Sequence, residues 1–133
     1  MGYRSTVHLA VAFGSRQNMK EILSVYAMHP FVQKHKLLDE WEEKEDNILY
    51  LHQDYVKWYD SYEDVQGFEH LFKLVEQFYD ERALPYAWRS IRLGEDIGDV
   101  EVRDNYGDDQ TSTELIDLLW DNMQVEVNVD VSL

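Results

Sequence analysis

The sequence predicts an α+β fold, with a mainly antiparallel sheet of four to five strands and two main helices packed on one face. Two observations predict it. Strand-like and helix-like segments follow one another in the order strand, helix, strand, helix, strand, strand, short helix, strand. No low-complexity linker or repeat divides the chain, and 133 residues with 44% apolar content suffice for a single domain over residues 1–133. A doubly wound α/β fold is the alternative, but it needs more parallel crossovers than this length supplies.

The first strand and the first helix have clear sequence boundaries. Residues 3–13 place apolar residues at alternate positions, which predicts a strand with one strongly apolar face. Gly14 ends this strand, and Ser15 is suited to cap a helix whose apolar residues recur at spacings of three and four. The helix is expected to end near His29, because a residue before proline is pushed out of the α region. Pro30 suits the first position of a second short helix.

The middle of the chain holds the most acidic segment and the clearest helix. Asp39 to Asp46 carries six acids among eight residues, so we expect an exposed loop or a frayed helix there. Residues 48–58 are rich in Ile, Leu, Tyr and Val and predict the second strand. Asp60 or Ser61 is expected to cap the next helix. Its apolar stripe has spacings of three and four and comprises Val65, Phe68, Phe72, Val75 and Tyr79.

The last third of the chain is expected to contain three strands and a short helix. Residues 86–93 predict the third strand and residues 100–103 a fourth. A short helix follows, for which Thr111 and Glu114 form a candidate capping box. Four valines then alternate with polar residues over residues 125–131, which predicts a half-buried terminal strand.

Charge is distributed unevenly along the chain. The formal net charge is −15, with net +4 over residues 1–36 and net −19 over residues 37–133. Such a chain repels nucleic acid and anionic membranes and attracts basic surfaces. No apolar run approaches the length of about 18 residues that a membrane span needs. We therefore expect the partner to be a protein with a basic surface, with no direct binding of nucleic acid or membrane.

No motif for catalysis, metal binding or cofactor binding stands out. The chain has no cysteine, which excludes disulfides, thiolate metal sites and a cysteine nucleophile, and favours a reducing, cytoplasmic setting. The five histidines lack the spacing of a helical metal pair, and the acids around Gly107 do not fit a calcium loop. Phosphate-binding loops and a serine elbow are absent as well. We expect no catalytic residues, metal or cofactor, while a small carboxylate-metal enzyme stays an alternative.

Acids in two segments, residues 39–46 and 95–109, are the candidate partner-binding residues. A rigid array of carboxylates can imitate a phosphate backbone and occupy the groove of a nucleic-acid-binding protein. The alternative is that the charge only keeps the protein in solution. Trp41 is either a core residue or an exposed anchor for a partner. The candidate residues are Asp39, Glu40, Trp41, Glu42, Glu43, Glu95, Asp96, Asp99, Asp104, Asp108 and Asp109.

Three short blocks carry a resemblance to known proteins. Gly2 to Ser5, Lys57 to Tyr62 and Ile91 to Asp96 together resemble a loose group of small, acidic, mostly uncharacterised proteins encoded by tailed bacteriophages. The resemblance implies a protein that acts inside an infected bacterium, and it implies no catalytic residues. Phage accessory proteins of this size usually bind a host protein, such as a CRISPR effector, a restriction enzyme or a polymerase.

Charge and resemblance together predict a non-catalytic inhibitor, of anti-CRISPR or anti-restriction type, that evades host defence. It would bind a host nucleic-acid-handling or defence protein through its acidic surface. A virion structural or assembly protein is the alternative. A homodimer is a further alternative, because the bases near the N-terminus can contact the acidic remainder of a second copy. Those bases are Arg4, Arg16, Lys20, Lys34 and Lys36.

Overall fold

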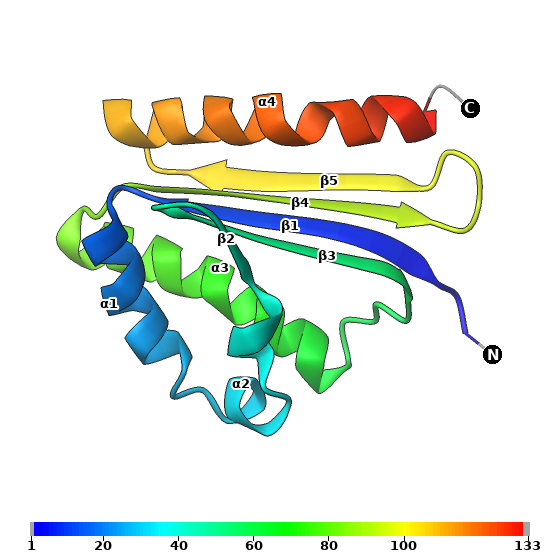
Figure 1. Cartoon of the computed structure of the whole chain (residues 1–133), viewed down its shortest axis with the longest axis horizontal. Helices are drawn as coiled ribbons and strands as arrows, with labels where there is room; N and C mark the ends of the chain where they lie inside the picture. The colour runs from blue at the N-terminus through cyan, green and yellow to red at the C-terminus, as the bar shows by residue number, and fades with distance from the viewer. Residues whose placement is uncertain (1, 132–133) are drawn as a thin grey trace.

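A five-stranded antiparallel sheet lies between two helical layers (Figure 1). The computed structural model describes residues 2–131, and the side chains of residues 2–123. The elements follow the chain in the order β1 (Ser5–Phe13), α1 (Arg16–Tyr26), α2 (Pro30–Lys34), the 3₁₀ turn η1 (Leu37–Glu40), β2 (Glu42–Glu45), β3 (Ile48–Val56), α3 (Glu63–Arg82), β4 (Tyr86–Gly94), β5 (Val100–Tyr106) and α4 (Gln110–Val131).

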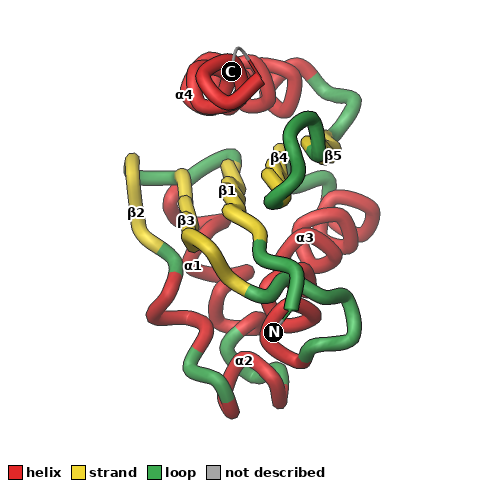
Figure 2. Tube along the Cα trace, turned by 90° about the vertical axis from the view of Figure 1, so that its right-hand side faces the viewer, coloured by secondary structure: helices red, strands yellow, loops and turns green. Residues whose placement is uncertain are grey.

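The strands are arranged in the order β2-β3-β1-β4-β5, so β1 is central and β2 and β5 are the two edges (Figure 2). β1 pairs antiparallel with β3 on one side and β4 on the other. Helices α1, α2 and α3 lie on one face of the sheet, and α4 lies on the opposite face (Figure 1). The predicted α+β fold with an antiparallel sheet is confirmed. Helices α1 and α3 share one face as expected, but the longest helix, α4, covers the opposite face, which the prediction left bare.

The alternation of residues in β1 divides the core into two clusters. One face of β1 packs against α1 and α3 through Val7, Leu9, Val11 and Phe13. The other face carries Ala10 and Ala12, which form a second cluster with Ile116 and Leu119 of α4. Alanine is small, so α4 can approach this face of the sheet closely. The long helices therefore bury apolar surface on both sides of one sheet.

Several predicted boundaries are confirmed. Ser15 caps α1, because its hydroxyl accepts a hydrogen bond from the Asn18 N–H at 3.1 Å. Pro30 is the first residue of α2, where its missing N–H costs nothing. The predicted strands at 3–13, 48–58 and 86–93 correspond to β1, β3 and β4 within two residues at each end.

The predicted cap of α3 is wrong. This helix begins at Glu63, and its N-cap, Tyr62, makes no capping bond with its side chain. The Tyr62 N–H donates instead to the Tyr59 carbonyl at 2.9 Å. That bond closes a turn ahead of the helix, and Asp60 and Ser61 lie inside the turn.

The prediction of a loop or frayed helix for Asp39 to Asp46 is wrong for half of this segment. After η1, residues 42–45 form the edge strand β2, with Glu42 opposite Tyr50 and Glu43 opposite Leu49. Pairing with β3 satisfies backbone groups on one side, while all four side chains of β2 stay exposed. Charged side chains on a free edge also discourage pairing with another chain.

The first turn of α4 uses a different cap from the predicted one. The Asp109 carboxylate accepts a hydrogen bond from the Ser112 N–H at 3.3 Å. Glu114, which was expected to complete a capping box with Thr111, accepts instead from the Gln110 side chain at 3.1 Å. An aspartate is as good a cap as threonine or better, so the helix starts two residues earlier than the box requires.

The predicted terminal strand over residues 125–131 is also wrong, because α4 continues to Val131. No glycine or proline follows Gly107 in the sequence. Extending an existing helix adds one hydrogen bond per residue fixed, and valine costs only about 0.5 kcal/mol relative to alanine. The alternating valines are therefore compatible with a helix that has already been nucleated upstream.

Candidate functional site

The two acidic segments lie at opposite edges of the sheet. Residues 39–46 form η1 and the edge strand β2, whereas residues 95–109 form the β4–β5 turn, the edge strand β5 and the start of α4. Four strand spacings of about 4.8 Å separate the two edges, or roughly 19 Å. The structure therefore does not bring the predicted partner-binding residues together into one surface.

The acids at the β2 edge are exposed and mostly unneutralised. Arg16 reaches Glu43 at 3.1 Å, and both side chains are about half exposed. Within the described residues, no hydrogen bond or ion pair engages the carboxylates of Asp39, Glu40 and Glu42. This edge is a solvated row of negative charge.

Trp41 belongs to the core. Its side chain is 8% exposed, and its indole N–H donates to the hydroxyl of Tyr26 at 3.1 Å. The ring also meets Phe68 edge-on, with the ring centroids 6.1 Å apart. Of the two roles left open by the sequence, Trp41 therefore has the structural one.

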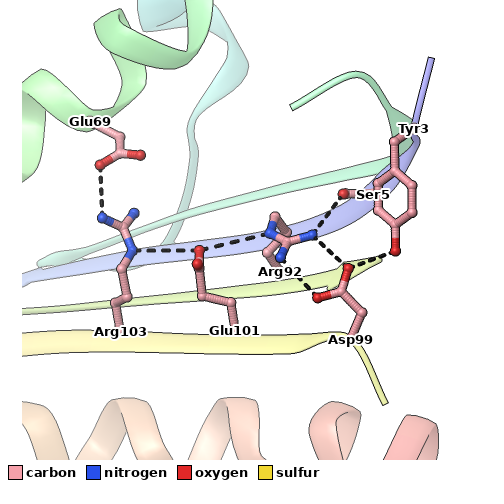
Figure 3. A network of polar contacts seen from close by, with 7 residues as sticks. All are labelled: Tyr3, Ser5, Glu69, Arg92, Asp99, Glu101 and Arg103. Atoms are coloured by element: carbon pink, nitrogen blue, oxygen red, sulfur yellow. Dashed lines mark hydrogen bonds and ion pairs between the residues drawn. The ribbon is translucent and has the colours of Figure 1, made fainter. Parts of the chain in front are cut away.

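The acids at the β4–β5 turn hold the N-terminal segment in place (Figure 3). Asp99 binds the Arg92 guanidinium with both oxygens, at 3.0 and 3.2 Å, and accepts a hydrogen bond from the Tyr3 hydroxyl at 2.6 Å. These bonds, from Arg92 first and Tyr3 second, lower the pKa of Asp99. The Asp96 N–H donates to the Tyr3 hydroxyl, and Glu95 accepts from the Arg4 N–H. The carboxylates of Asp99 and Glu95 therefore act within the chain, whereas Asp96 contributes only its backbone N–H.

The same network continues across β5 to α3 (Figure 3). Glu101 lies 3.8 Å from Arg92 and 4.0 Å from Arg103, and Arg103 reaches Glu69 of α3 at 3.0 Å. Residues from β4, β5 and α3 thus alternate in charge along one row. Each of its carboxylates has a guanidinium within the same chain, which leaves little free negative charge on this side of β5.

Asp108 and Asp109 also have structural roles. The Tyr79 hydroxyl donates to the Asp108 carboxylate, and the Asp108 N–H donates back to the same hydroxyl at 3.1 Å. This pair ties the start of α4 to the end of α3, while Asp109 caps α4. Sequence inspection finds these acids but cannot assign them to internal contacts.

A third acidic surface, which the sequence reasoning missed, lies on α4 and the neighbouring part of β5. Glu114, Asp117 and Asp121 are exposed and recur at spacings of three and four, so they form one row along the helix. Trp120 is 39% exposed, and its indole N–H donates to Asp104 of β5 at 3.0 Å. We call this set the α4 face, comprising Asp104, Glu114, Asp117, Trp120 and Asp121.

The two helical layers differ in how many bases accompany their acids. No Lys or Arg occurs after Arg103, so α4 carries acids without any base. Over α1, α2, α3 and the turn after α2, the layer on the opposite face of the sheet carries six bases and seven acids, and the bases are Arg16, Lys20, Lys34, Lys36, Lys73 and Arg82. Two of the bases expected to meet a second copy are engaged within the chain, because Arg16 binds Glu43 and Lys34 binds Glu63. Helix α4 is therefore the more acidic of the two helical layers.

The fold brings histidines together in two pairs that are far apart in sequence. The rings of His29 and His70 are 4.2 Å apart, and those of His8 and His52 are 4.3 Å apart. Burial, followed by the charges of His29 and Lys73, lowers the pKa of His70. Among the described residues, no three His, Asp or Glu side chains are grouped closely enough to hold a metal ion.

Comparisons with protein-family profiles, curated protein sequences and solved structures give no significant match for this chain. No helix in the described part of the chain combines the length and the apolar character needed to cross a membrane.

Proposed function

We propose that this chain is a non-catalytic binding protein of the type that tailed phages encode. It inhibits a host nucleic-acid-handling or defence protein by docking the α4 face on a basic surface of that protein. The observation that supports this most is the local composition of the α4 face. Four exposed carboxylates lie on or beside a helix that has no Lys or Arg, around the exposed Trp120.

The spacing of charge on α4 is suited to approximate mimicry of nucleic acid. Glu114 and Asp121 are seven residues apart, which is about 10 Å along a helix. With Asp117 between them, the row carries one charge per roughly 5 Å, against about 3.4 Å along one strand of DNA. The row therefore reaches about two-thirds of the linear charge density of a strand, and Asp104 adds a charge beside it.

Trp120 adds an exposed aromatic surface to the charged α4 face. Its indole is fixed by the bond to Asp104, and the Arg89 guanidinium lies 5.8 Å from the centre of its ring. An aromatic side chain held in one orientation loses little entropy on binding, and a tryptophan surrounded by polar groups is a common interface anchor. The acids would then steer association and make it sensitive to salt.

The test is an affinity capture from a bacterial lysate with three tagged forms of the chain: wild type, a neutralised α4 face and a matched control. The α4 variant carries Glu114→Gln, Asp117→Asn and Asp121→Asn. The control carries Asp39→Asn, Glu40→Gln and Glu42→Gln at the β2 edge, which removes the same charge from equally exposed positions. Bound proteins are identified by mass spectrometry at about 50 and 500 mM salt, where the Debye length falls from roughly 14 to 4 Å.

The proposal predicts that wild type and control retain a nucleic-acid-binding or defence protein at low salt and release it at high salt. The α4 variant should lose this protein at both salt concentrations. Equal capture by the α4 variant and wild type would contradict docking through α4. Loss in the β2 control alone would place the surface at the β2 edge instead.

A further inference from the structure

The outer edge of β5 carries backbone groups that no strand covers. β5 is the last strand of the sheet, and within residues 2–131 it pairs only with β4. Two backbone bonds bracket this ladder, from the Gly94 N–H to the Asp99 carbonyl at 2.8 Å and from the Gly107 N–H to the Tyr86 carbonyl at 3.3 Å. In an antiparallel pair, successive residues turn their backbone N–H and C=O groups alternately toward the partner strand and away from it. Counting from these two bonds, residues 101, 103 and 105 turn their backbone groups toward β4. The even-numbered residues of β5 turn theirs outward.

Two of the four outward N–H groups are already satisfied. Val100 donates to the Gly98 carbonyl at 3.0 Å, and Tyr106 donates to the Asn105 side chain at 2.9 Å. For Val102 and Asp104 no hydrogen-bond acceptor is found among the described residues. The centre of the β5 edge therefore presents two free donors, with free carbonyls on the same side.

The two edges of the sheet differ in how they discourage pairing with another chain. β2 has four residues, all charged and exposed. β5 has seven residues, and its outward-turned positions include Val102, 42% exposed, and Tyr106, 39% exposed. A charged, short edge resists strand addition, whereas a longer edge with exposed apolar residues does not. Strand addition is therefore favoured at β5.

Charge along β5 is complementary to itself in one register. We propose that β5 pairs antiparallel with β5 of a second copy of this chain, with Val102 opposite Val102. This register places Glu101 opposite Arg103 of the second copy, and Arg103 opposite its Glu101. Opposite charges facing each other across an antiparallel pair stabilise it, and like charges destabilise it.

The neighbouring registers fail this criterion. Centring the pair on residue 101, 103 or 104 places Glu101, Arg103 or Asp104 opposite its own copy. A register that places an even-numbered residue opposite an odd-numbered one also fails. It would set the outward-turned backbone groups of one strand against backbone groups of the other strand that already bind β4. The register centred on Val102 joins the sheets by four backbone bonds, from Val102 N–H to Val102 C=O and from Asp104 N–H to Val100 C=O, each occurring twice.

The pairing has consequences for the acidic surface. Its two-fold axis is perpendicular to the sheet, so the two α4 helices lie on the same face of a ten-stranded sheet. Each copy has a net charge of −15, and this long-range repulsion opposes pairing at low salt. Self-association should therefore strengthen as salt screens the repulsion, which is the opposite of the salt dependence expected for a basic partner.

The first test uses the absence of cysteine from the chain. In Val102→Cys, the two new thiols would sit on residues whose Cα atoms are about 5.5 Å apart in the dimer, within the range for a disulfide. The control is Ile97→Cys in the β4–β5 turn, which is 96% exposed and therefore better placed for random collisions. On oxidation of the purified chain at about 500 mM salt, Val102→Cys should form covalent dimer several-fold faster than Ile97→Cys. A rate equal to or below that of the control would overturn the proposal.

The second test measures the charge pairs by sedimentation equilibrium. Glu101→Arg alone sets arginine opposite arginine twice, and Arg103→Glu alone sets glutamate opposite glutamate twice. Each variant should self-associate about tenfold more weakly than wild type, while an equimolar mixture regains the wild-type affinity as a heterodimer. Lys20→Glu and Glu42→Arg control for net charge, and circular dichroism checks folding.

Failure of the mixture to associate, with both variants folded, would contradict the register. If either variant does not fold, the cysteine test decides. Both tests use the purified chain without any other protein, so their failure leaves the proposed docking of the α4 face untouched.

Discussion

Replacing Leu119 with alanine tests whether α4 is packed against the sheet as the structure describes. Leu119 is 1% exposed and lies in the cluster that joins α4 to β1, β3 and β4. The substitution removes three buried carbons, which are worth about 2.4 kcal/mol at about 0.8 kcal/mol each. The cavity left behind adds to this, so we expect the free energy of unfolding to fall by about 3–4 kcal/mol.

The neighbouring residue provides a matched control. Leu118 is on the same helix but is 42% exposed, and Leu118→Ala makes the same change in helix propensity. We expect it to cost less than about 0.5 kcal/mol. Urea denaturation followed by circular dichroism measures both variants. Equal effects of the two substitutions would refute the packing of Leu119 of α4 against the sheet. A fall in the free energy of unfolding below about 1 kcal/mol for Leu119→Ala would refute it as well.

Three further predictions concern internal contacts. Ser112→Ala leaves the buried Tyr86 N–H without its acceptor at 3.0 Å, so urea denaturation should show a loss of about 1–3 kcal/mol; an unchanged midpoint would contradict this. Asp99 has a lowered pKa, so its contribution to stability is complete above its ordinary pKa near 4 and is lost as pH falls further. The difference in melting temperature between wild type and Asp99→Asn should therefore shrink below about pH 4, and a constant difference down to pH 3 would argue against it. Trp41→Phe should lower stability by about 1 kcal/mol through loss of the bond to Tyr26 and leave partner capture unchanged.

The parts of the fold that could be predicted are those with local signals. Alternation over residues 3–13 predicts β1, and the stripe of spacings three and four predicts α3. The end of the chain shows the limit of such signals. Alternating valines over residues 125–131 favour a strand when considered alone, but a helix capped at Asp109 extends through them without a glycine or proline to stop it.

The candidate site shows a different limit. Sequence locates acids but does not show which of them are held by contacts within the chain, because some of those contacts join residues that are distant in sequence. Asp99 is bound by Tyr3, which is 96 residues away, and Asp108 by Tyr79, which is 29 residues away. Nothing local distinguishes the exposed Trp120 from the buried Trp41. The one available signal was the absence of Lys and Arg after Arg103, which marks the last helix as the acidic element.

Competition with DNA tests whether the α4 face occupies the nucleic-acid groove of its partner. A protein captured by the wild-type chain is loaded with fluorescently labelled duplex DNA, and the anisotropy is followed as the chain is added. Docking of the α4 face on a nucleic-acid groove predicts that wild type releases the DNA and that the variant with Glu114→Gln, Asp117→Asn and Asp121→Asn does not. Formation of a ternary complex, in which the chain and the DNA stay bound to the same protein, would contradict the proposed function.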